Sequence, residues 1–88
     1  MVKVVRFTAN WCSPCRALAP IIEDIKEQNP DVEFQVVDID DTPELVSQYS
    51  VMSVPTVIIQ NNGVETNRFI GIQPKAMYEN AINNQKGN

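Results

Sequence analysis

The feature that most constrains the fold of this 88-residue chain is the cysteine pair in Trp11-Cys12-Ser13-Pro14-Cys15. These are its only 2 cysteines, and a strand-like run of β-branched residues precedes them. Their spacing places both in what is expected to be the first turn of a helix. Unpaired N–H groups and a partial positive charge there favour a thiolate over a thiol. Two thiols so spaced can close a disulfide without moving the backbone, so the sequence predicts a reversible two-electron switch.

Size, charge and composition argue against several classes of protein. A chain of 88 residues, 43% of them hydrophobic, makes one domain (residues 1–88) with a modest core. The net charge of −4 disfavours nucleic acid and anionic membranes as partners. No apolar run approaches the roughly 18 residues that span a bilayer, and the strand-like start leaves no room for a signal peptide. The expected compartment is the cytoplasm, where a lone cysteine pair is more often catalytic or metal-binding than structural.

The spacing of apolar residues predicts the order β-α-β-α-β-β-α. Strands are expected at residues 2–9, 32–38, 57–60 and 64–70, and helices from the cysteines to about 28, over 43–49 and from 74 onward. The first helix connects two strands that should therefore be parallel, and Asn61-Asn62-Gly63 indicates a hairpin turn. This order predicts an α/β fold, with a four-stranded mixed sheet flanked by three helices. The polar residues 83–88 are expected to fray.

This order, with the Trp-Cys-x-Pro-Cys motif after the first strand and Val54-Pro55-Thr56 before the third, resembles the thioredoxin family. The resemblance covers almost the whole chain and rests on further motifs: Phe7-x-Ala9-x-Trp11, Ala19-Pro20, Val37-Asp38-Ile39-Asp40, Asn62-Gly63 and Gly71. It implies a compact, glutaredoxin-sized thioredoxin fold without the N-terminal strand and helix of full-length members. Ser13 stands where glycine is usual, and the Cys-Pro-Tyr-Cys and Gly-Gly motifs of glutaredoxins are not seen.

The resemblance implies a protein disulfide reductase, a dithiol–disulfide electron carrier that cycles Cys12 and Cys15 between dithiol and disulfide. Cys12 would be the partly exposed nucleophile that attacks a client disulfide, and the more buried Cys15 would resolve the mixed disulfide. No bound cofactor is implied besides this redox-active disulfide. The implied partners of the monomer are a flavoprotein thioredoxin reductase and clients such as ribonucleotide reductase.

Further residues are expected to bind substrate or support the pair: Trp11, Ser13, Pro14, Val54, Pro55 and Gly71. Trp11 is expected to form a flat, half-exposed contact surface, and the two residues between the cysteines to set the stiffness of the ring. The family's proline at the position of Pro55 is cis and lies against the cysteines, which leaves the preceding backbone free to pair with a substrate segment. Gly71 would either allow a close backbone approach or simply end its strand.

Arg6 is the informative departure from the family. A buried aspartate is usual at this position, beneath the second cysteine, and Val36 stands where a partner lysine is often found. An arginine cannot act as a general base, so proton transfer from Cys15 is expected to use water or a nearby carboxylate. We expect Arg6 to reach the surface or to pair with Asp38 or Asp40. Without a buried carboxylate, the pKa of Cys12 should stay below the free-thiol value of about 8.5.

Several alternatives stay open at this point. A structural disulfide would be a weak constraint, because so small a ring contributes only about 2 kcal/mol. A zinc site within one chain would need carboxylates, since there is no histidine. Three further alternatives are a metal or cluster shared by two chains, a glutaredoxin-like electron donor that uses glutathione, and a non-catalytic binding module.

Overall fold

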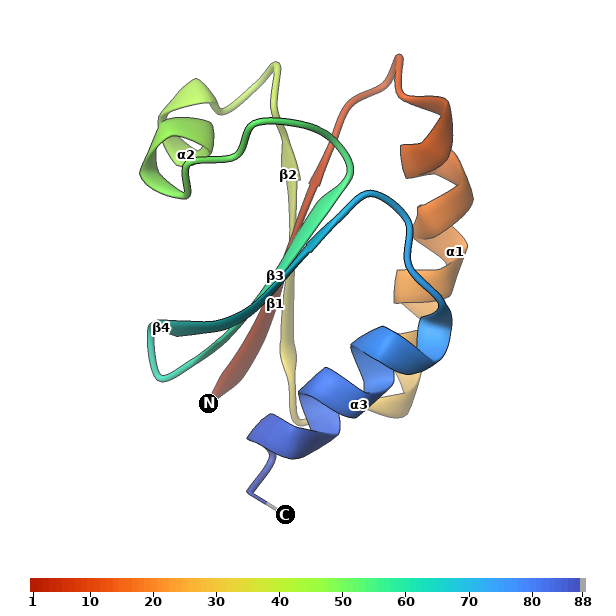
Figure 1. The fold of residues 1–88 in the computed structure, drawn as a ribbon, viewed down its shortest axis with the longest axis vertical. Coiled ribbons are helices and arrows are strands. Elements are labelled where there is room, and N and C mark those ends of the chain that lie inside the picture. The colour runs from red at the N-terminus through yellow and green to blue at the C-terminus, as the bar shows by residue number, and fades with distance from the viewer. Residues whose placement is uncertain (88) are drawn as a thin grey trace.

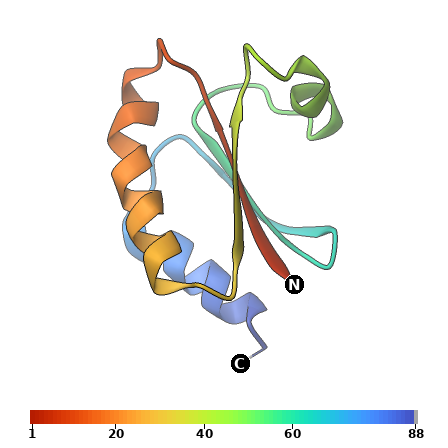
Figure 2. The same cartoon turned by 180° about the vertical axis from the view of Figure 1, so that it is seen from behind.

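The computed structural model describes residues 1–87, and its elements follow the predicted order. They are β1 (Val2–Thr8), α1 (Ser13–Gln28), β2 (Glu33–Asp38), α2 (Pro43–Gln48), β3 (Thr56–Asn61), β4 (Val64–Ile70) and α3 (Lys75–Gln85). The strands form one mixed sheet, and helices cover both of its faces (Figures 1 and 2). The predicted α/β fold class is confirmed.

The strand order in the sheet is β2-β1-β3-β4. As predicted, β1 and β2 are parallel, and β3 and β4 form an antiparallel hairpin. The hairpin turn uses positive φ angles at Asn62 (53°) and Gly63 (85°), which asparagine and glycine tolerate best. β1 therefore lies inside the sheet, with β2 on one side and β3 on the other, and it ends where the cysteines begin.

Alternate residues of β1 point into two separate cores, because successive side chains of a strand face opposite ways. Val2 and Val4 join the cluster beneath α1 and α3, together with Leu18, Ile22 and Tyr78. The other cluster lies beneath α2 and contains Val5, Phe7, Val37, Val51 and Ile58. In Figure 1, α1 and α3 accordingly lie on one side of the sheet and α2 on the other.

Helix α1 forms for reasons visible in its sequence. Pro14 stands in the first turn, where its missing N–H costs no hydrogen bond. Leu18, Ile22 and Ile25 recur on one face and are buried against the sheet. Pro20 lies inside the helix, which continues to Gln28. The predicted apolar stripe thus anchors the helix whose first turn carries the cysteines.

The end of the chain differs from the prediction. Helix α3 continues to Gln85, so residues 83–85 are helical rather than frayed. Long-range contacts hold this end: the Asn61 side-chain N–H₂ donates to the carbonyl of Gln85 at 3.2 Å, and Lys86 pairs with Asp31 at 3.0 Å. Asn88 lies outside the described residues. Within residues 1–87, no helix has both the length and the apolar character needed to cross a membrane.

Candidate active site

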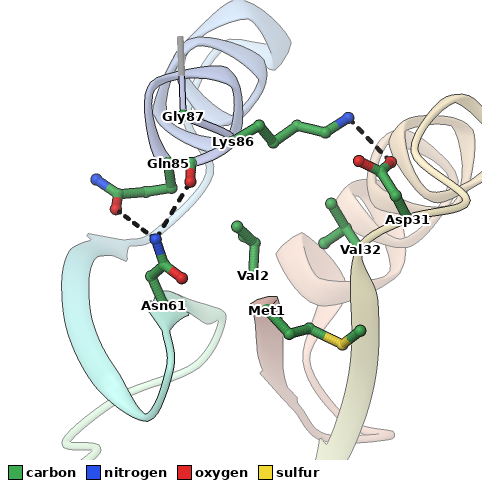
Figure 3. Close-up of a pocket in the computed structure, with 8 residues that line it drawn as sticks. All are labelled: Met1, Val2, Asp31, Val32, Asn61, Gln85, Lys86 and Gly87. Carbon is green, nitrogen blue, oxygen red and sulfur yellow. Dashed lines mark hydrogen bonds and ion pairs between the residues drawn. The ribbon is translucent and has the colours of Figure 1, made fainter.

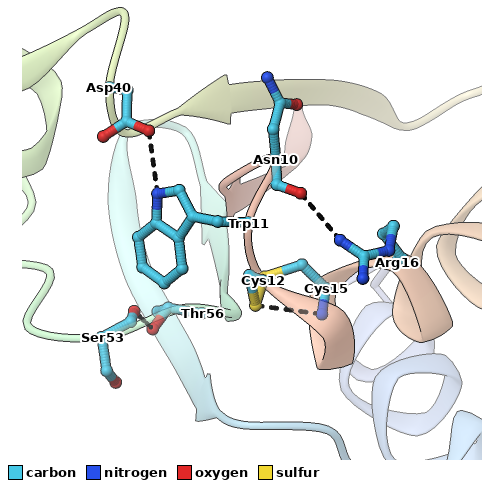
Figure 4. Close-up of a disulfide and its surroundings, with 8 residues drawn as sticks. All are labelled: Asn10, Trp11, Cys12, Cys15, Arg16, Asp40, Ser53 and Thr56. Atoms are coloured by element: carbon cyan, nitrogen blue, oxygen red, sulfur yellow. Dashed lines mark hydrogen bonds between the residues drawn. A yellow bond between two sulfur atoms is a disulfide. The ribbon is translucent and has the colours of Figure 1, made fainter.

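Cys12 and Cys15 form a disulfide at the junction of β1 and α1, with their Cα atoms 5.2 Å apart (Figure 4). Cys12 is the N-cap of α1, and its Sγ accepts a hydrogen bond from the backbone N–H of Cys15 at 3.2 Å. An N-cap normally uses an oxygen acceptor to satisfy such an N–H group. Here the sulfur takes that place, so the helix N-terminus directs a donor at Cys12.

The partial exposure expected for Cys12 is wrong for this disulfide state. Cys12 is only 5% exposed and Cys15 only 1%. Both pack with Ala9 and with the half-buried side chains of Ile39 and Val54. Val54 comes from a loop that lies far away in sequence, so local pattern gave no sign of this cover. The order of burial, with Cys15 deeper than Cys12, agrees with the expectation.

Trp11 lies on the surface beside the pair and is 66% exposed. Its indole Nε1–H donates to Oδ2 of Asp40 at 3.0 Å, and the N–H of Asp40 donates to Oδ1 of Asp38 at 2.9 Å (Figure 4). The structure shows that Asp40 holds the ring of Trp11 from the end of β2.

The loop before β3 lies against the cysteines. The Val54–Pro55 peptide bond is cis, and Val54 packs on the disulfide. The Thr56 hydroxyl donates to the carbonyl of Ser53 at 2.8 Å, while the N–H of Gly71 donates to the carbonyl of Pro55 at 2.9 Å. Val54 therefore lies against the cysteines, and Gly71 is joined by its hydrogen bond to Pro55, the next residue of the loop.

Gly71 is needed for its backbone conformation. Its φ is +76°, a backbone conformation that residues other than glycine rarely adopt. A Cβ added there would meet nothing within 4 Å, so the chain itself makes no close approach at this point. The residue follows the last residue of β4, which agrees with the reading of Gly71 as the end of its strand.

The remaining residues around the pair are exposed. Ser13 and Pro14, between the cysteines, face solvent. The Arg16 guanidinium donates from Nη1 to the carbonyl of Asn10 at 2.8 Å and ties the first turn of α1 to the preceding loop (Figure 4). Sequence reasoning did not select Arg16, and no motif pointed to it.

An apolar hollow of about 250 Å³ opens next to Trp11 and Val54. Its other lining residues come from α2, from the end of β2 and from the loop before β3: Ile39, Val46, Val51, Met52 and Ser53. Met52 is 93% exposed at its rim. The disulfide is therefore bordered by an apolar surface that other molecules can reach. Sequence reasoning missed Met52, for which only its place near Pro55 gave a signal.

Arg6 is buried, which corrects the expected surface position. It is 7% exposed, and its Nε has no hydrogen-bond partner within the described residues. Neither Asp38 nor Asp40 pairs with it within the described residues, and their carboxylates accept from the Asp40 N–H and from Trp11. Burial lowers the pKa of Arg6, and the charge of Glu23 on α1 partly opposes this effect.

A second hollow, of about 310 Å³, lies at the opposite end of the sheet and contains none of the predicted site residues (Figure 3). Its polar groups already have partners. Asn61 bonds to Gln85, and Lys86 bonds to Asp31 and to Asn29. Across residues 1–87, no three His, Cys, Asp or Glu side chains converge as metal ligands would.

A family model described as thioredoxin matches residues 1–84. The chain belongs to the thioredoxin family. Among curated relatives, thioredoxin H5 from Oryza sativa subsp. japonica is 43% identical over 68 residues, 77% of this chain and 50% of that protein. The thioredoxin of Mycoplasmoides gallisepticum is 43% identical over 72 residues, 82% of this chain and 72% of that protein. The chain thus spans half the length of the rice relative and about three quarters of the bacterial one.

Solved thioredoxin structures show the same arrangement of elements. Fasciola hepatica thioredoxin superposes with a TM-score of 0.88 at 37% identity, over 96% of this chain and 80% of that one. Thioredoxin NaTrxh from Nicotiana alata superposes with a TM-score of 0.90 at 30% identity, over 96% of this chain and 72% of that one. Thioredoxins are disulfide reductases that use their own redox-active cysteine pair, are reduced by thioredoxin reductase and act on protein disulfides. This chain is accordingly a thiol–disulfide oxidoreductase.

Proposed function

We propose that Cys12 is the nucleophile and Cys15 the resolving thiol of a protein disulfide reductase. The observation that carries this assignment is the hydrogen bond from the Cys15 N–H to Sγ of Cys12 at the N-cap of α1. A donor and the positive end of a helix both stabilise negative charge on that sulfur. Cys15 lies one turn into the helix and is only 1% exposed, against 5% for Cys12. Cys12 is therefore the sulfur that a client reaches first.

The reaction then proceeds by two thiol–disulfide exchanges. The Cys12 thiolate attacks one sulfur of a client disulfide, which forms a Cys12–client bond and releases the other client sulfur as a thiolate. Cys15 loses its proton to water and attacks Sγ of Cys12, so the mixed disulfide breaks and the Cys12–Cys15 bond forms. Two electrons pass from the pair to the client, which leaves as a dithiol.

We infer that the client segment lies across Trp11, Val54 and the apolar hollow. Within the described residues, the backbone N–H and C=O of Val54 make no hydrogen bond, so both are free to pair with an extended segment. The cis Val54–Pro55 bond and the contact of Val54 with the cysteines support this position. Trp11 and Met52 supply apolar area on either side. Ser13 and Pro14 are assigned to the ring that closes between the cysteines.

We further propose that the protein works as a single-domain monomer in the cytoplasm. A flavoprotein thioredoxin reductase would return the disulfide to the dithiol, and ribonucleotide reductase is the kind of client whose disulfide it would reduce. The family match supports the reductase as a partner, and the exposed apolar surface beside the pair supports the docking of client proteins.

The test is reduction of insulin disulfides with thioredoxin reductase and NADPH, using the intact chain and Cys12→Ser. We expect turnover with the intact chain and none with Cys12→Ser. Ser47→Ala is the control, because it changes an exposed residue of α2 outside the site and should retain most of the activity. Turnover with glutathione in the absence of thioredoxin reductase would instead favour a glutaredoxin-like donor. A cellular role preserved in Cys12→Ser would favour a binding module.

A further inference from the structure

Arg6 is a buried cation that makes no direct ion pair within the described residues. It is 7% exposed, its Nε is unpartnered, and its neighbours across the sheet are apolar, Val36 on β2 and Val57 on β3. Within the described residues, Arg6 forms no ion pair, and Glu23 is the charge that acts on it. Glu23 therefore offsets only part of the cost of burying this charge, and a second anion close to Arg6 would stabilise it further.

The register of the sheet places Arg6 beside the cysteines. Val4 and Leu18 belong to one buried cluster. β1 runs toward the junction and α1 runs back from it (Figure 1). Arg6 lies two residues beyond Val4, about 7 Å along the strand and on the same face. Cys15 lies three residues before Leu18, about 4.5 Å along the helix in the same direction.

Arg6 and Cys15 therefore occupy the next layer of the same interface between the sheet and α1. Cys15 is 1% exposed and, like Leu18, lies on the buried face of the helix. In the oxidised state the pair is a neutral disulfide. Reduction by two electrons breaks the S–S bond and gives two thiols, either of which can lose a proton to water and become a thiolate. Only then does the layer contain an anion.

We propose that Arg6 stabilises the thiolate of the reduced cysteine pair and thereby makes the Cys12–Cys15 disulfide easier to reduce. The cation interacts favourably with the anionic dithiol and not with the neutral disulfide, so its charge shifts the equilibrium between these two states. Arg6 is thus a positioning residue that tunes the potential through its charge. This inference rests on the proposed exchange chemistry of the two cysteines.

The experiment measures the equilibrium protein disulfide + 2 glutathione ⇌ protein dithiol + oxidised glutathione. At an effective dielectric constant of about 20, a unit charge roughly 10 Å away changes such an equilibrium by about tenfold. We therefore expect Arg6→Met to lower the equilibrium constant about tenfold. This decrease corresponds to a reduction potential of the cysteine pair that is about 30 mV more negative. Arg6→Lys keeps the charge and should stay within about twofold of the unchanged protein.

Lys3→Met is the matched control, because Lys3 is on the same strand and carries the same charge. It lies on the opposite face and pairs with Glu33 at 3.7 Å, far from the junction. It should leave the equilibrium constant within about twofold. If Arg6→Met does not fold, Arg6→Gln replaces it with a polar neutral side chain, and the same tenfold decrease is expected.

The outcomes separate this inference from the proposed function. An equilibrium constant unchanged in the neutral Arg6 variants, or lowered equally by Lys3→Met, would overturn the role of Arg6. Failure of the unchanged protein to exchange with glutathione at all would instead overturn the exchange chemistry itself. A second readout is the stability of the two redox states to urea. The neutral variants should destabilise the reduced protein relative to the oxidised protein by the same factor of about ten.

Discussion

The indole N–H of Trp11 donates to the carboxylate of Asp40 across 3.0 Å, which connects the residue before the nucleophile to the loop after β2. Trp11 is 66% exposed, so little else fixes its ring. Asp40 is in turn fixed through its own N–H by Asp38. The flat surface beside the disulfide is therefore oriented by the acidic segment at the end of β2.

Removing the Asp40 carboxylate should weaken client binding. A hydrogen bond to a charged group at an exposed site contributes about 1 kcal/mol, so Asp40→Ala should raise KM for a protein disulfide about fivefold and leave kcat nearly unchanged. Asp40→Asn keeps an acceptor and should recover part of the loss. Asp41→Ala is the control, since Asp41 is also exposed and its side chain makes no hydrogen bond within the described residues. Equal effects at both positions would contradict a role for the Trp11–Asp40 contact.

Met52 should contribute to the affinity for clients through its exposed thioether. It is 93% exposed at the rim of the apolar hollow, where Met52→Gln would reduce the apolar area offered to a client. We expect a rise in KM of about threefold to tenfold, measured by insulin reduction, with an unchanged equilibrium against glutathione. Met77→Gln on α3, where the methionine is 47% exposed, serves as the control. A change in potential without a change in KM would argue against docking at this rim.

Stability should fall in alkali partly because of Tyr78. Burial raises the pKa of Tyr78 above its ordinary value of 10.0, although its hydroxyl oxygen accepts an N–H from Gln73 at 3.0 Å. Above about pH 10 the unfolded tyrosine releases its proton while the folded one retains it. Stability is therefore fully present below that pH and declines as the pH rises toward the folded pKa.

Urea unfolding of the protein and of Tyr78→Phe, at pH 8 and above pH 10, tests this linkage. At pH 8 the unchanged protein should be the more stable by about 1 kcal/mol, because of the hydrogen bond to the hydroxyl. The gap should narrow as the pH rises, since phenylalanine does not titrate. A gap that stays constant would contradict the shift at Tyr78.

Truncation of the core beneath the cysteine helix should be costly. Leu18 is fully buried, and Leu18→Ala should reduce the free energy of unfolding by about 2–5 kcal/mol. Val64→Ala on β4, where the valine is 66% exposed, should change it by less than about 0.5 kcal/mol. Similar costs at the two sites in urea titrations would show that the α1 interface is not the main core.

The element order could be predicted because each element carries its own local signal. The apolar stripe of α1, the asparagine–glycine turn and the alternation of β1 act over a few residues, and all three correspond to elements of the structure. The burial and the contacts of individual side chains depend on the three-dimensional arrangement of these elements instead. Strand alternation gives the face of Arg6 but not the burial of its side chain, which is only 7% exposed.

The errors share one physical cause, which is contact between distant segments. Val54 covers Cys12 from a loop more than 40 residues away in the chain, so the sulfur is less exposed than its place before a helix suggests. The polar residues 83–85 stay helical because Asn61 and Asp31 hold the end of α3. Asp40 contacts Trp11 across the first βαβ crossover. Composition and periodicity describe neighbouring residues only, so they could not predict these contacts between distant segments.

The most direct test of the central claim identifies which sulfur a client disulfide captures. Cys15→Ser and Cys12→Ser proteins would each be incubated with a protein disulfide, quenched with acid and analysed by mass spectrometry for a covalent adduct. We expect a stable mixed disulfide on Cys12 in Cys15→Ser, because its resolving thiol is missing, and almost none on Cys15 in Cys12→Ser. Equal adduct formation at both sulfurs, or none at Cys12, would contradict the assignment of Cys12 as the accessible nucleophile.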